Sequence, residues 1–403
     1  MKVVIAPDKF KECLSAAQVA QAIARGVLEV DPQAVIDLCP MADGGDGTVD
    51  AMVAATGGKL LAADVFDPLG APLRAHFGLL GSSRAAGLPG ELGFSAATAA
   101  AQGEGYVDEP YGRRTAVIEM AAASGLALVS TDKRDPMRTT TFGTGQLILA
   151  AIQAGASRII LGIGGSATVE GGCGCAQAIG VTFLDEHGEM MVCGMGGGSL
   201  ASIGKVDMSG RDDRIAGTEI LVACDVTNPL TGPQGAAAVF GPQKGATPEM
   251  VAQLDAGLKH LADVVRSQLG IEIDSLSGAG AAGGLGGGLV AFAGARLQRG
   301  VEIVADAVNL RRRIAGADLV ITGEGRLDAS SAFGKTAVGV ARMAKEAGVP
   351  VVAIAGDATA DAPRGEFTSV YSLSGPEVPP RQAIRFAAQL LQKHAAEAIR
   401  LHV

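Results

Sequence analysis

The sequence contains no tryptophan, and aromatic residues make up only 3% of the chain. Hydrophobic residues nevertheless make up 48%, and 58 residues are glycine. A core without large rings has to be built from aliphatic and small side chains. We therefore predict parallel sheets covered by helices rather than a sandwich of two sheets.

The sequence also lacks any block of lysine and arginine, and its net charge is −9. A protein of this charge repels polyanions, which argues against nucleic acid or an anionic membrane as its main partner. A small anionic substrate remains compatible with the composition, provided that a few lysines gather at one site.

No segment of the sequence resembles a membrane span or a signal peptide. The uncharged stretch at 277–295 contains eight glycines and few large apolar side chains, unlike a membrane span. The apolar run after Met1 ends at Asp8 and is too short for a signal peptide. The six cysteines show no CxxC spacing, so neither a zinc site nor a disulfide framework is indicated. We expect a reduced, cytoplasmic protein without a membrane partner.

Several segments repeat one pattern: a short β-branched run, a loop rich in glycine and aspartate, and a helix with apolar residues at i, i+3 and i+4. Residues 3–6, for example, are followed by "PDKFKECLS" and by a helix that Ser15 can cap. This alternation predicts βαβ units and a parallel sheet. The length of 403 residues favours two domains.

The middle of the chain has a different pattern. Residues 60–80 and 181–193 alternate apolar and polar side chains around turn signals, as β-hairpins do. We predict a second α+β domain, inserted into the parallel-sheet domain, and a surface excursion at 81–112. The parallel-sheet domain would comprise residues 1–60 and about 300–403, with about 126–178 as a further candidate segment, and the inserted domain about 61–125 and about 179–299.

The stretch "LVITGEGRLDASSAFGKTAVGVA", residues 319–341, ends its loop with the last three letters of a phosphate-binding P-loop. The full pattern GxxxxGK[ST] requires a glycine five residues before Gly334, and this chain has Ala329 there. The strand-like run also ends too early for the short turn of that motif. The P-loop interpretation therefore fails, and the charged side chains of this loop need another explanation.

In open parallel sheets, ligands bind beyond the carboxyl ends of the strands, and this rule gathers charged loop residues from distant segments. Carboxylates can hold Mg²⁺, lysines can offset the charge of a phosphate, and glycine N–H groups can bind its oxygens. The set therefore predicts phosphoryl transfer. It comprises Asp8, Lys9, Lys11, Asp43, Asp46, Ser166, Thr168, Asp225, Thr227, Asn228, Lys244, Glu324, Arg326, Asp328, Lys335 and Asp357.

Each of these residues also has a purely structural interpretation. The "ADGGDG" stretch suits a turn, Asp46 can cap the helix that follows, and Lys244 can be solvated in its Pro/Gly loop. Lys335 stands at a helix start, where a cation is disfavoured, and Glu324 stands between two glycines after a buried strand. Those last two positions favour function.

The main alternative is an NAD-dependent oxidoreductase acting on a small hydroxy acid. Residues 162–167 satisfy GxGxx[GA], and Asp185 lies near the distance of a ribose-binding acid. Residues 278–283 satisfy GxGxxG without a clear preceding strand, so the pattern arises easily in this glycine-rich chain. A serine hydrolase is disfavoured because Ser166 lacks the second glycine of GxSxG.

Eight motifs occur in order along the chain: "IAPDKFKECLSA", "MADGGDGT", "AVIEMAAASGLALV", "TTTFGTG", "IGGSAT", "ACDVTNPLTGPQGAAAVFGPQKGA", "GAGAAGGLG" and "VITGEGRLD". Together they closely resemble the class I glycerate kinase family across about residues 1–375. The resemblance implies an α/β enzyme with a flavodoxin-like parallel-sheet domain and an inserted second α/β domain. It also implies the use of ATP and Mg²⁺ to phosphorylate D-glycerate, usually on the 2-hydroxyl. Whether the protein forms a homodimer is left open.

The residues and the resemblance together suggest roles. Glu324 or Asp328 would orient the substrate hydroxyl or Mg²⁺, and Lys335 would meet a phosphate or the substrate carboxylate. The predicted catalytic residues are Asp43, Glu324, Asp328 and Lys335; the substrate or phosphate ligands are Asp8, Lys11, Asn228, Lys244 and Arg326; the nucleotide-binding residues are Gly164, Gly165, Ser166, Thr168, Gly283 and Gly284; and the metal ligands are Asp225 and Glu324.

The chain departs from the family pattern in two places. Val169-Glu170 stands where Asn-Asp is usual, which lengthens a carboxylate and removes an amide. The excursion at 81–112 exceeds the short turn expected there, and it is compatible with either a lid or a surface insertion.

Overall fold

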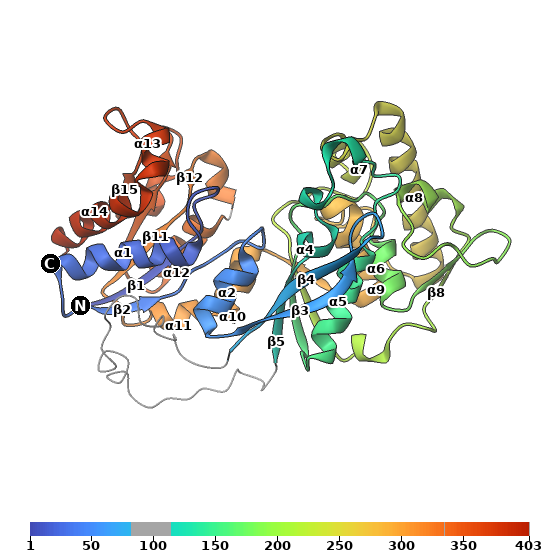
Figure 1. Ribbon diagram of the computed structural model, residues 1–403, viewed down its shortest axis with the longest axis horizontal. Coiled ribbons are helices and arrows are strands. Elements are labelled where there is room, and N and C mark those ends of the chain that lie inside the picture. Colours follow the sequence, from blue (N-terminus) through green and yellow to red (C-terminus); the bar gives the residue numbers. More distant parts are fainter. Residues whose placement is uncertain (82–113, 334, 403) are drawn as a thin grey trace.

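The computed structural model describes residues 1–81, 114–333 and 335–402. It contains two lobes, each built on one main β-sheet (Figure 1). The excursion predicted at 81–112 lies outside the described residues, apart from Gly81. Of the helices in the described part of the chain, none is long and apolar enough to cross a membrane.

The first lobe contains a five-stranded sheet whose neighbouring strands are all parallel. The spatial order β2-β1-β11-β13-β15 is the 2-1-3-4-5 arrangement of flavodoxin-like sheets. The predicted flavodoxin-like fold is thereby confirmed, and the order of the strands reverses between β1 and β11. The strands span Lys2–Pro7 (β1), Val35–Leu38 (β2), Leu319–Gly323 (β11), Val351–Ala355 (β13) and Ser369–Ser372 (β15).

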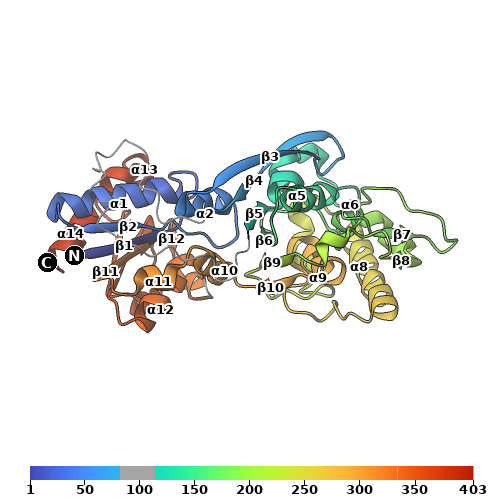
Figure 2. The ribbon, with the colours of Figure 1, turned by 90° about the horizontal axis from the view of Figure 1, so that it is seen from below.

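Side chains of each strand point alternately to the two faces of the sheet, and helices cover both faces. Val3 and Ile5 belong to the buried cluster under α1 and α14, whereas Val4 and Ala6 belong to the cluster under α2, α10, α11 and α12 (Figure 2). The helices span Ala16–Val30 (α1), Thr48–Thr56 (α2), Gly300–Ala307 (α10), Leu310–Ile314 (α11), Thr336–Glu346 (α12) and Ala387–Arg400 (α14).

Helix α1 begins at the predicted cap. Ser15 Oγ accepts the N–H of Gln18 at 3.3 Å, and the Gln18 side chain accepts the N–H of Ser15 at 2.9 Å. This capping box satisfies backbone donors that would otherwise lack partners at a helix start. Further along α1, Gly26 allows close contact with α14, because a Cβ there would lie 2.1 Å from the carbonyl oxygen of Gln392.

The second lobe contains a six-stranded mixed sheet of order β10-β9-β6-β5-β4-β3. β3 and β4 form the antiparallel hairpin predicted at 60–80, β4 pairs antiparallel with β5, and the other neighbours are parallel. Helices α5, α6, α8 and α9 cover one face. The elements span Lys59–Phe66 (β3), Pro72–Leu79 (β4), Thr115–Glu119 (β5), Arg158–Gly162 (β6), Glu219–Ala223 (β9), Arg296–Gln298 (β10), Phe142–Gln153 (α5), Cys173–Ala178 (α6), Pro248–Leu269 (α8) and Leu285–Ala293 (α9).

The hairpin predicted at 181–193 has a different partner. β7 (Thr182–Leu184) pairs antiparallel with β8 (Lys205–Asp207), and an isolated bridge joins Leu184 to Met190. The turn is present, but the returning strand comes from later in the chain. The shorter elements span Ala121–Ser124 (α4), Ala236–Phe240 (α7), Pro380–Arg385 (α13), Arg326–Leu327 (β12) and Asp357–Ala358 (β14).

One buried cluster runs through both lobes. Val117, Ile160 and Leu221 of the six-stranded sheet share this cluster with Val4 of the five-stranded sheet. α2 and α10 contact strands of the six-stranded sheet, so they join the lobes near the two points at which the chain crosses. Strand β6, within the candidate segment of about 126–178, pairs with β5 and β9 and therefore belongs to the six-stranded sheet. The apolar residues of β6 would suit a buried strand of either sheet, so the composition does not assign this strand to a lobe. The observed strand pairing does.

Candidate active site

Asp8 and Glu324 follow the two neighbouring strands at which the strand order reverses. Asp8 comes directly after β1 and Glu324 directly after β11, and the N–H of Asp8 donates to the carbonyl oxygen of Gly323 at 2.8 Å. Ligand sites of doubly wound sheets lie at this reversal point. The structure therefore brings these two predicted site residues to one edge of the sheet.

Glu324 is buried, with 6% of its surface exposed, and its Oε1 accepts the hydroxyl of Ser331 at 2.5 Å. Burial raises the pKa of Glu324 to about 7, and the carboxylates of Asp8 and Asp43 act in the same direction. The Ser331 hydrogen bond and the charge of Lys335 oppose that shift. A carboxyl group with a pKa near neutrality is suited to accept a proton from a substrate hydroxyl.

Asp8 is oriented by two hydrogen bonds. Its Oδ2 accepts the hydroxyl of Thr336 at 2.6 Å, and its Oδ1 accepts the N–H of Lys9 at 2.7 Å. Burial and the neighbouring charge of Asp43 raise the pKa of Asp8 to about 6. Asp8 is therefore fixed in place and contributes negative charge at the same edge as Glu324.

Asp225 of the second lobe meets Asp43 of the first lobe at Gly300. Oδ1 of Asp225 accepts the N–H of Gly300 at 2.9 Å. A Cβ on Gly300 would lie 1.7 Å from the carbonyl oxygen of Asp43, so only glycine allows this approach. Although the residue is exposed, partial burial of its carboxylate and the charge of Asp43 raise the pKa of Asp225 to about 6. Asp43 thus lies close to carboxylates of both lobes.

Carboxylate oxygens are the ligands that Mg²⁺ prefers. Among the described residues, no three acidic, histidine or cysteine side chains lie close enough together to enclose a metal ion. Mg²⁺ needs no such cage, because kinases hold it with one or two carboxylates and the phosphates of the substrate. The donor chemistry of Asp43 and Asp225 fits that mode of binding.

Asp328 lies between two cations. Lys335 Nζ is 3.7 Å from Asp328 Oδ1, and Arg326 Nε is 3.5 Å from Asp328 Oδ2 and 4.0 Å from Asp357 Oδ2. A hydrogen bond from the Ser330 hydroxyl, followed by the charge of Lys335, holds the pKa of Asp328 below its ordinary value. Asp328 therefore stays ionised and orients Lys335. Both cations remain partly exposed and can meet an anion.

The loop after β6 combines an exposed glycine backbone with a buried support. Gly164 and Gly165 are exposed, as a phosphate cradle requires. Lys244 lies on the inner side, where its Nζ donates to Ser166 Oγ at 2.6 Å and to the carbonyl oxygen of Thr168 at 2.7 Å. Only 1% of the Lys244 surface is exposed, and burial lowers its pKa to about 7.

Three predicted ligands are thus placed differently from the prediction. The ammonium group of Lys244 is not available to a phosphate in this structure, because it supports the loop from within. The Ser166 hydroxyl already has a partner, and Oγ1 of Thr168 is buried with no hydrogen-bond partner in the described part of the chain. Of the predicted cradle in this loop, the backbone of Gly164 and Gly165 stays accessible.

Gly283 and Gly284 are also placed differently from the prediction, because both are buried. A Cβ on Gly283 would lie 1.8 Å from the carbonyl oxygen of Thr168, and one on Gly284 would lie 2.8 Å from Cα of Gly171. Both glycines adopt positive φ angles, 73° and 92°. They therefore permit close packing of two backbones instead of presenting N–H groups to a nucleotide.

The remaining predicted ligands differ in their availability. Nδ2 of Asn228 donates to the carbonyl oxygen of Gln234 at 2.8 Å, so the amide shapes its own loop. Lys9 contacts the backbone carbonyl and the carboxylate of Asp46. Lys11 is exposed and makes no hydrogen bond or ion pair with the residues that the structure describes. Within the described part of the chain, the ammonium group of Lys11 is therefore free to bind an anion.

Two acids near the site carry no predicted role. Glu119 ends β5, and its Oε1 accepts the N–H of Val49 at the start of α2 at 2.8 Å; burial raises its pKa. Glu170 is fully buried, and its two oxygens accept the Thr141 hydroxyl at 2.6 Å and the N–H of Gly174 at 2.7 Å. The position of Glu119 at the end of a buried strand is the signal in the sequence that could have identified it as a site residue. The longer side chain of Glu170 thus connects the start of α5 to the start of α6 through these two hydrogen bonds.

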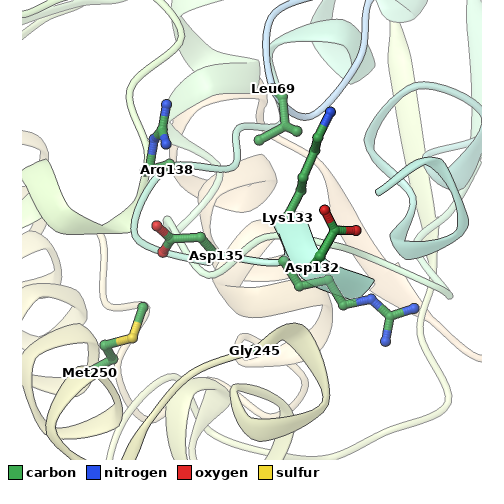
Figure 3. Close-up of a pocket in the computed structure, with 8 residues that line it drawn as sticks. Leu69, Asp132, Lys133, Asp135, Arg138, Gly245 and Met250 are labelled. Atoms are coloured by element: carbon green, nitrogen blue, oxygen red, sulfur yellow. The ribbon is translucent and has the colours of Figure 1, made fainter. Parts of the chain in front are cut away.

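The second lobe also contains an open cavity that the sequence analysis does not predict (Figure 3). It has a volume of about 620 Å³ and lies between the β3–β4 turn, the segment 132–138 and Gly245. The signal in the sequence is the gathering of Lys133, Arg134 and Arg138 within six residues.

The glycines at 162–167 lack the structural context of a dinucleotide fingerprint. α6 begins only at Cys173, so these glycines do not open a helix directly after β6. Gly162 has another explanation, because a Cβ there would lie 2.2 Å from the carbonyl oxygen of Gly44. The glycine allows a loop of the first lobe to approach the second sheet.

The chain matches known proteins along nearly its whole length. Residues 3–403 match the model of the Glycerate kinase family. The chain is 46% identical over 400 residues to a glycerate kinase of Bacillus subtilis (strain 168), which covers 98% of this chain and 96% of that protein. It is 48% identical over 361 residues to a glycerate 2-kinase of Escherichia coli (strain K12), which covers 90% of this chain and 86% of that protein.

A crystal structure from Salmonella typhimurium LT2, described as a glycerate kinase 2, aligns with a TM-score of 0.85 at 44% identity and covers 100% of this chain and 98% of that chain. These matches confirm the resemblance carried by the eight motifs and support a kinase rather than an oxidoreductase. The chain belongs to the glycerate kinase family.

Proposed function

We propose that the protein transfers the γ-phosphate of ATP to the 2-hydroxyl of D-glycerate, giving 2-phosphoglycerate and ADP. Family membership supports a nucleotide-dependent kinase, and the names of the relatives support glycerate and its 2-hydroxyl as the acceptor. The observation that supports the proposal is that Asp43 lies close enough to raise the pKa of both Asp225 in the second lobe and Glu324 at the reversal point of the first sheet.

Glu324 is the general base in this proposal. The hydroxyl oxygen of glycerate attacks the γ-phosphorus while Glu324 takes up the hydroxyl proton, and the bond from the γ-phosphorus to ADP breaks. A pKa of about 7 suits this task at neutral pH. Asp328 is less suited, because its pKa is lowered and its oxygens already contact Ser330 and Lys335.

Asp43 and Asp225 are the residues that would hold Mg²⁺. When bound, Mg²⁺ would offset the negative charge on the transferred phosphate. The exposed N–H groups of Gly164 and Gly165 would bind phosphate oxygens from the second lobe.

The partly exposed cations of the first lobe, Lys11, Arg326 and Lys335, would bind the carboxylate of glycerate or the transferred phosphate. Closure of the two lobes around the joining helices α2 and α10 would exclude water, which would otherwise compete with glycerate for the phosphoryl group. We also propose that the enzyme is cytoplasmic.

The proposal is tested by measuring ADP release from Mg-ATP with and without D-glycerate. We expect ADP to form only when D-glycerate is present, and tartronate to serve as a poorer acceptor. ATP should raise the melting temperature of the protein and NAD should not. Release of ADP without glycerate, or stabilisation by NAD alone, would contradict the proposal.

A further inference from the structure

The open cavity of the second lobe has no role in the reaction described above. Its volume of about 620 Å³ lies within the range of roughly 300–1,000 Å³ that is usual for small-molecule pockets. Leu69 of the β3–β4 turn and Met250 of α8 give it apolar walls, and Lys133 and Arg138 extend on either side of Leu69 in Figure 3. The cavity can therefore hold a molecule larger than a single ion.

The acidic side chains of the cavity already have partners. Asp132 accepts a hydrogen bond from the Ser130 side chain, and Oδ1 of Asp135 accepts the N–H of Met137 at 3.0 Å. Both carboxylates are thus used within the turns of their own segment. Besides the Ser130 hydrogen bond, the charge of Lys133 contributes to lowering the pKa of Asp132, so Asp132 offsets part of the charge of Lys133.

The basic side chains are only partly neutralised by the described residues. Lys133 and Arg138 are exposed and form no hydrogen bond or ion pair with side chains of the described residues. Nε of Arg134 is buried, and no acceptor for it exists in the part of the chain that the structure describes. A buried donor without an acceptor is costly and marks a place for an acceptor from a ligand. Two exposed cations and one buried guanidinium nitrogen without an acceptor, all beside one cavity, favour an anionic ligand.

The cavity adjoins the exposed glycine loop after β6 through two contacts. Gly245 lines the cavity and follows Lys244, which donates to Ser166 at 2.6 Å. Thr139, which directly follows the lining residue Arg138, donates its hydroxyl to the carbonyl oxygen of Ala167 at 2.9 Å. The walls of the cavity and the loop that exposes Gly164 are therefore one connected structure.

We infer that this cavity binds the phosphate groups of the nucleotide, with Lys133, Arg134 and Arg138 as their cationic ligands. The inference rests on the proposed function, because that function requires a nucleotide. It extends the nucleotide site from the glycine loop to a segment, residues 132–138, that no motif assigns to it.

The test measures the Kd for ATP by calorimetry without glycerate, so that no turnover occurs. The double variant Lys133→Gln/Arg138→Gln removes two exposed cations of the cavity. The matched double variant Lys205→Gln/Arg312→Gln removes the same charge from exposed positions of β8 and α11. We expect the Kd for ATP to rise at least about tenfold in the cavity variant and to stay unchanged in the matched variant. Inorganic tripolyphosphate should displace ATP from the wild type.

An unchanged Kd in the cavity variant, or failure of tripolyphosphate to compete, would overturn the inference. Equal melting temperatures of the ligand-free variants establish that the fold is intact, and each single substitution is measured if the double variant is less stable. Glycerate phosphorylation with an unchanged KM for ATP in the cavity variant would refute this inference alone. Binding of ATP through these side chains without any phosphorylation of glycerate would refute the proposed function alone.

Discussion

Lys244 Nζ lies 2.6 Å from Ser166 Oγ and 2.7 Å from the carbonyl oxygen of Thr168, and these contacts tie two loops of the second lobe together. Lys244→Met removes both hydrogen bonds and keeps an unbranched apolar side chain. Because the carbonyl oxygen of Thr168 then lacks this partner, we expect a loss of about 1–3 kcal/mol in the free energy of unfolding. The KM for ATP should rise more than the KM for D-glycerate. Urea unfolding and steady-state kinetics measure the two effects.

Lys205→Met is the matched control for this prediction, because Lys205 is exposed on β8. It should leave both the unfolding curve and the two KM values unchanged. If Lys244→Met lowered the stability and left both KM values unchanged, the lysine would act on stability alone and the positioning role would be wrong.

Glu324→Gln should stabilise the protein at alkaline pH. The pKa of Glu324 is about 7 in the folded protein against an ordinary 4.5, so its stabilising contribution is complete below about pH 4.5 and is lost as the pH rises through about 7. Glutamine cannot ionise and can still accept the Ser331 hydroxyl. We expect the variant to be more stable than the wild type by roughly 1–3 kcal/mol at pH 8, with no such gain at pH 4.

The same variant should lose at least about tenfold in turnover, because the general base is removed. Urea unfolding at the two pH values and an ADP assay provide the measurements. A stability difference that does not change with pH would mean that Glu324 does not ionise in a buried position.

Asp43→Asn should shift the pH profile of the reaction to lower pH. The charge of Asp43 raises the pKa of Asp8, Asp225 and Glu324, so its removal lowers all three. Because the base must be deprotonated, kcat/KM rises with pH, and the midpoint of that rise should fall in the variant. Asp46→Asn is the control, since the Asp46 side chain is 87% exposed and should leave the midpoint in place. A midpoint that is identical in Asp43→Asn would contradict the charge coupling.

Gly300→Ala should separate the carboxylates of the two lobes. The added Cβ would lie 1.7 Å from the carbonyl oxygen of Asp43, so the backbone has to move. We expect a loss of about 1–3 kcal/mol in unfolding free energy, together with weaker activation by Mg²⁺. Gly375→Ala is the control, because nothing lies within 4 Å of its added Cβ. Wild-type stability and wild-type Mg²⁺ dependence in Gly300→Ala would show that this contact is not needed.

The sequence predicts the edge of the first sheet well. Asp8 and Glu324 each follow a short apolar run, and the rule for parallel sheets is enough to bring such residues together. The helix cap at Ser15 is equally local and was predicted for the same reason. Features that depend only on one loop and the adjoining strand or helix can therefore be predicted from the sequence.

The sequence fails where a residue is defined by a distant partner. Lys244 stands in a Pro/Gly loop that suggests a solvated surface, and only contacts with Ser166 and Thr168 across the fold bury it. Gly283 looks like part of a cradle, but it is needed for contact with Thr168. The apolar run of β6 suits a buried strand of either sheet, and strand pairing decides its lobe.

The position of the new phosphate distinguishes a 2-kinase from a 3-kinase. Purified protein is mixed with Mg-ATP, D-glycerate and enolase in the absence of phosphoglycerate mutase, and the absorbance of phosphoenolpyruvate is followed. We expect an immediate rise, because enolase accepts 2-phosphoglycerate directly. A rise that begins only after mutase is added would mean that the 3-hydroxyl is phosphorylated, and no rise with no release of ADP would contradict glycerate as the substrate.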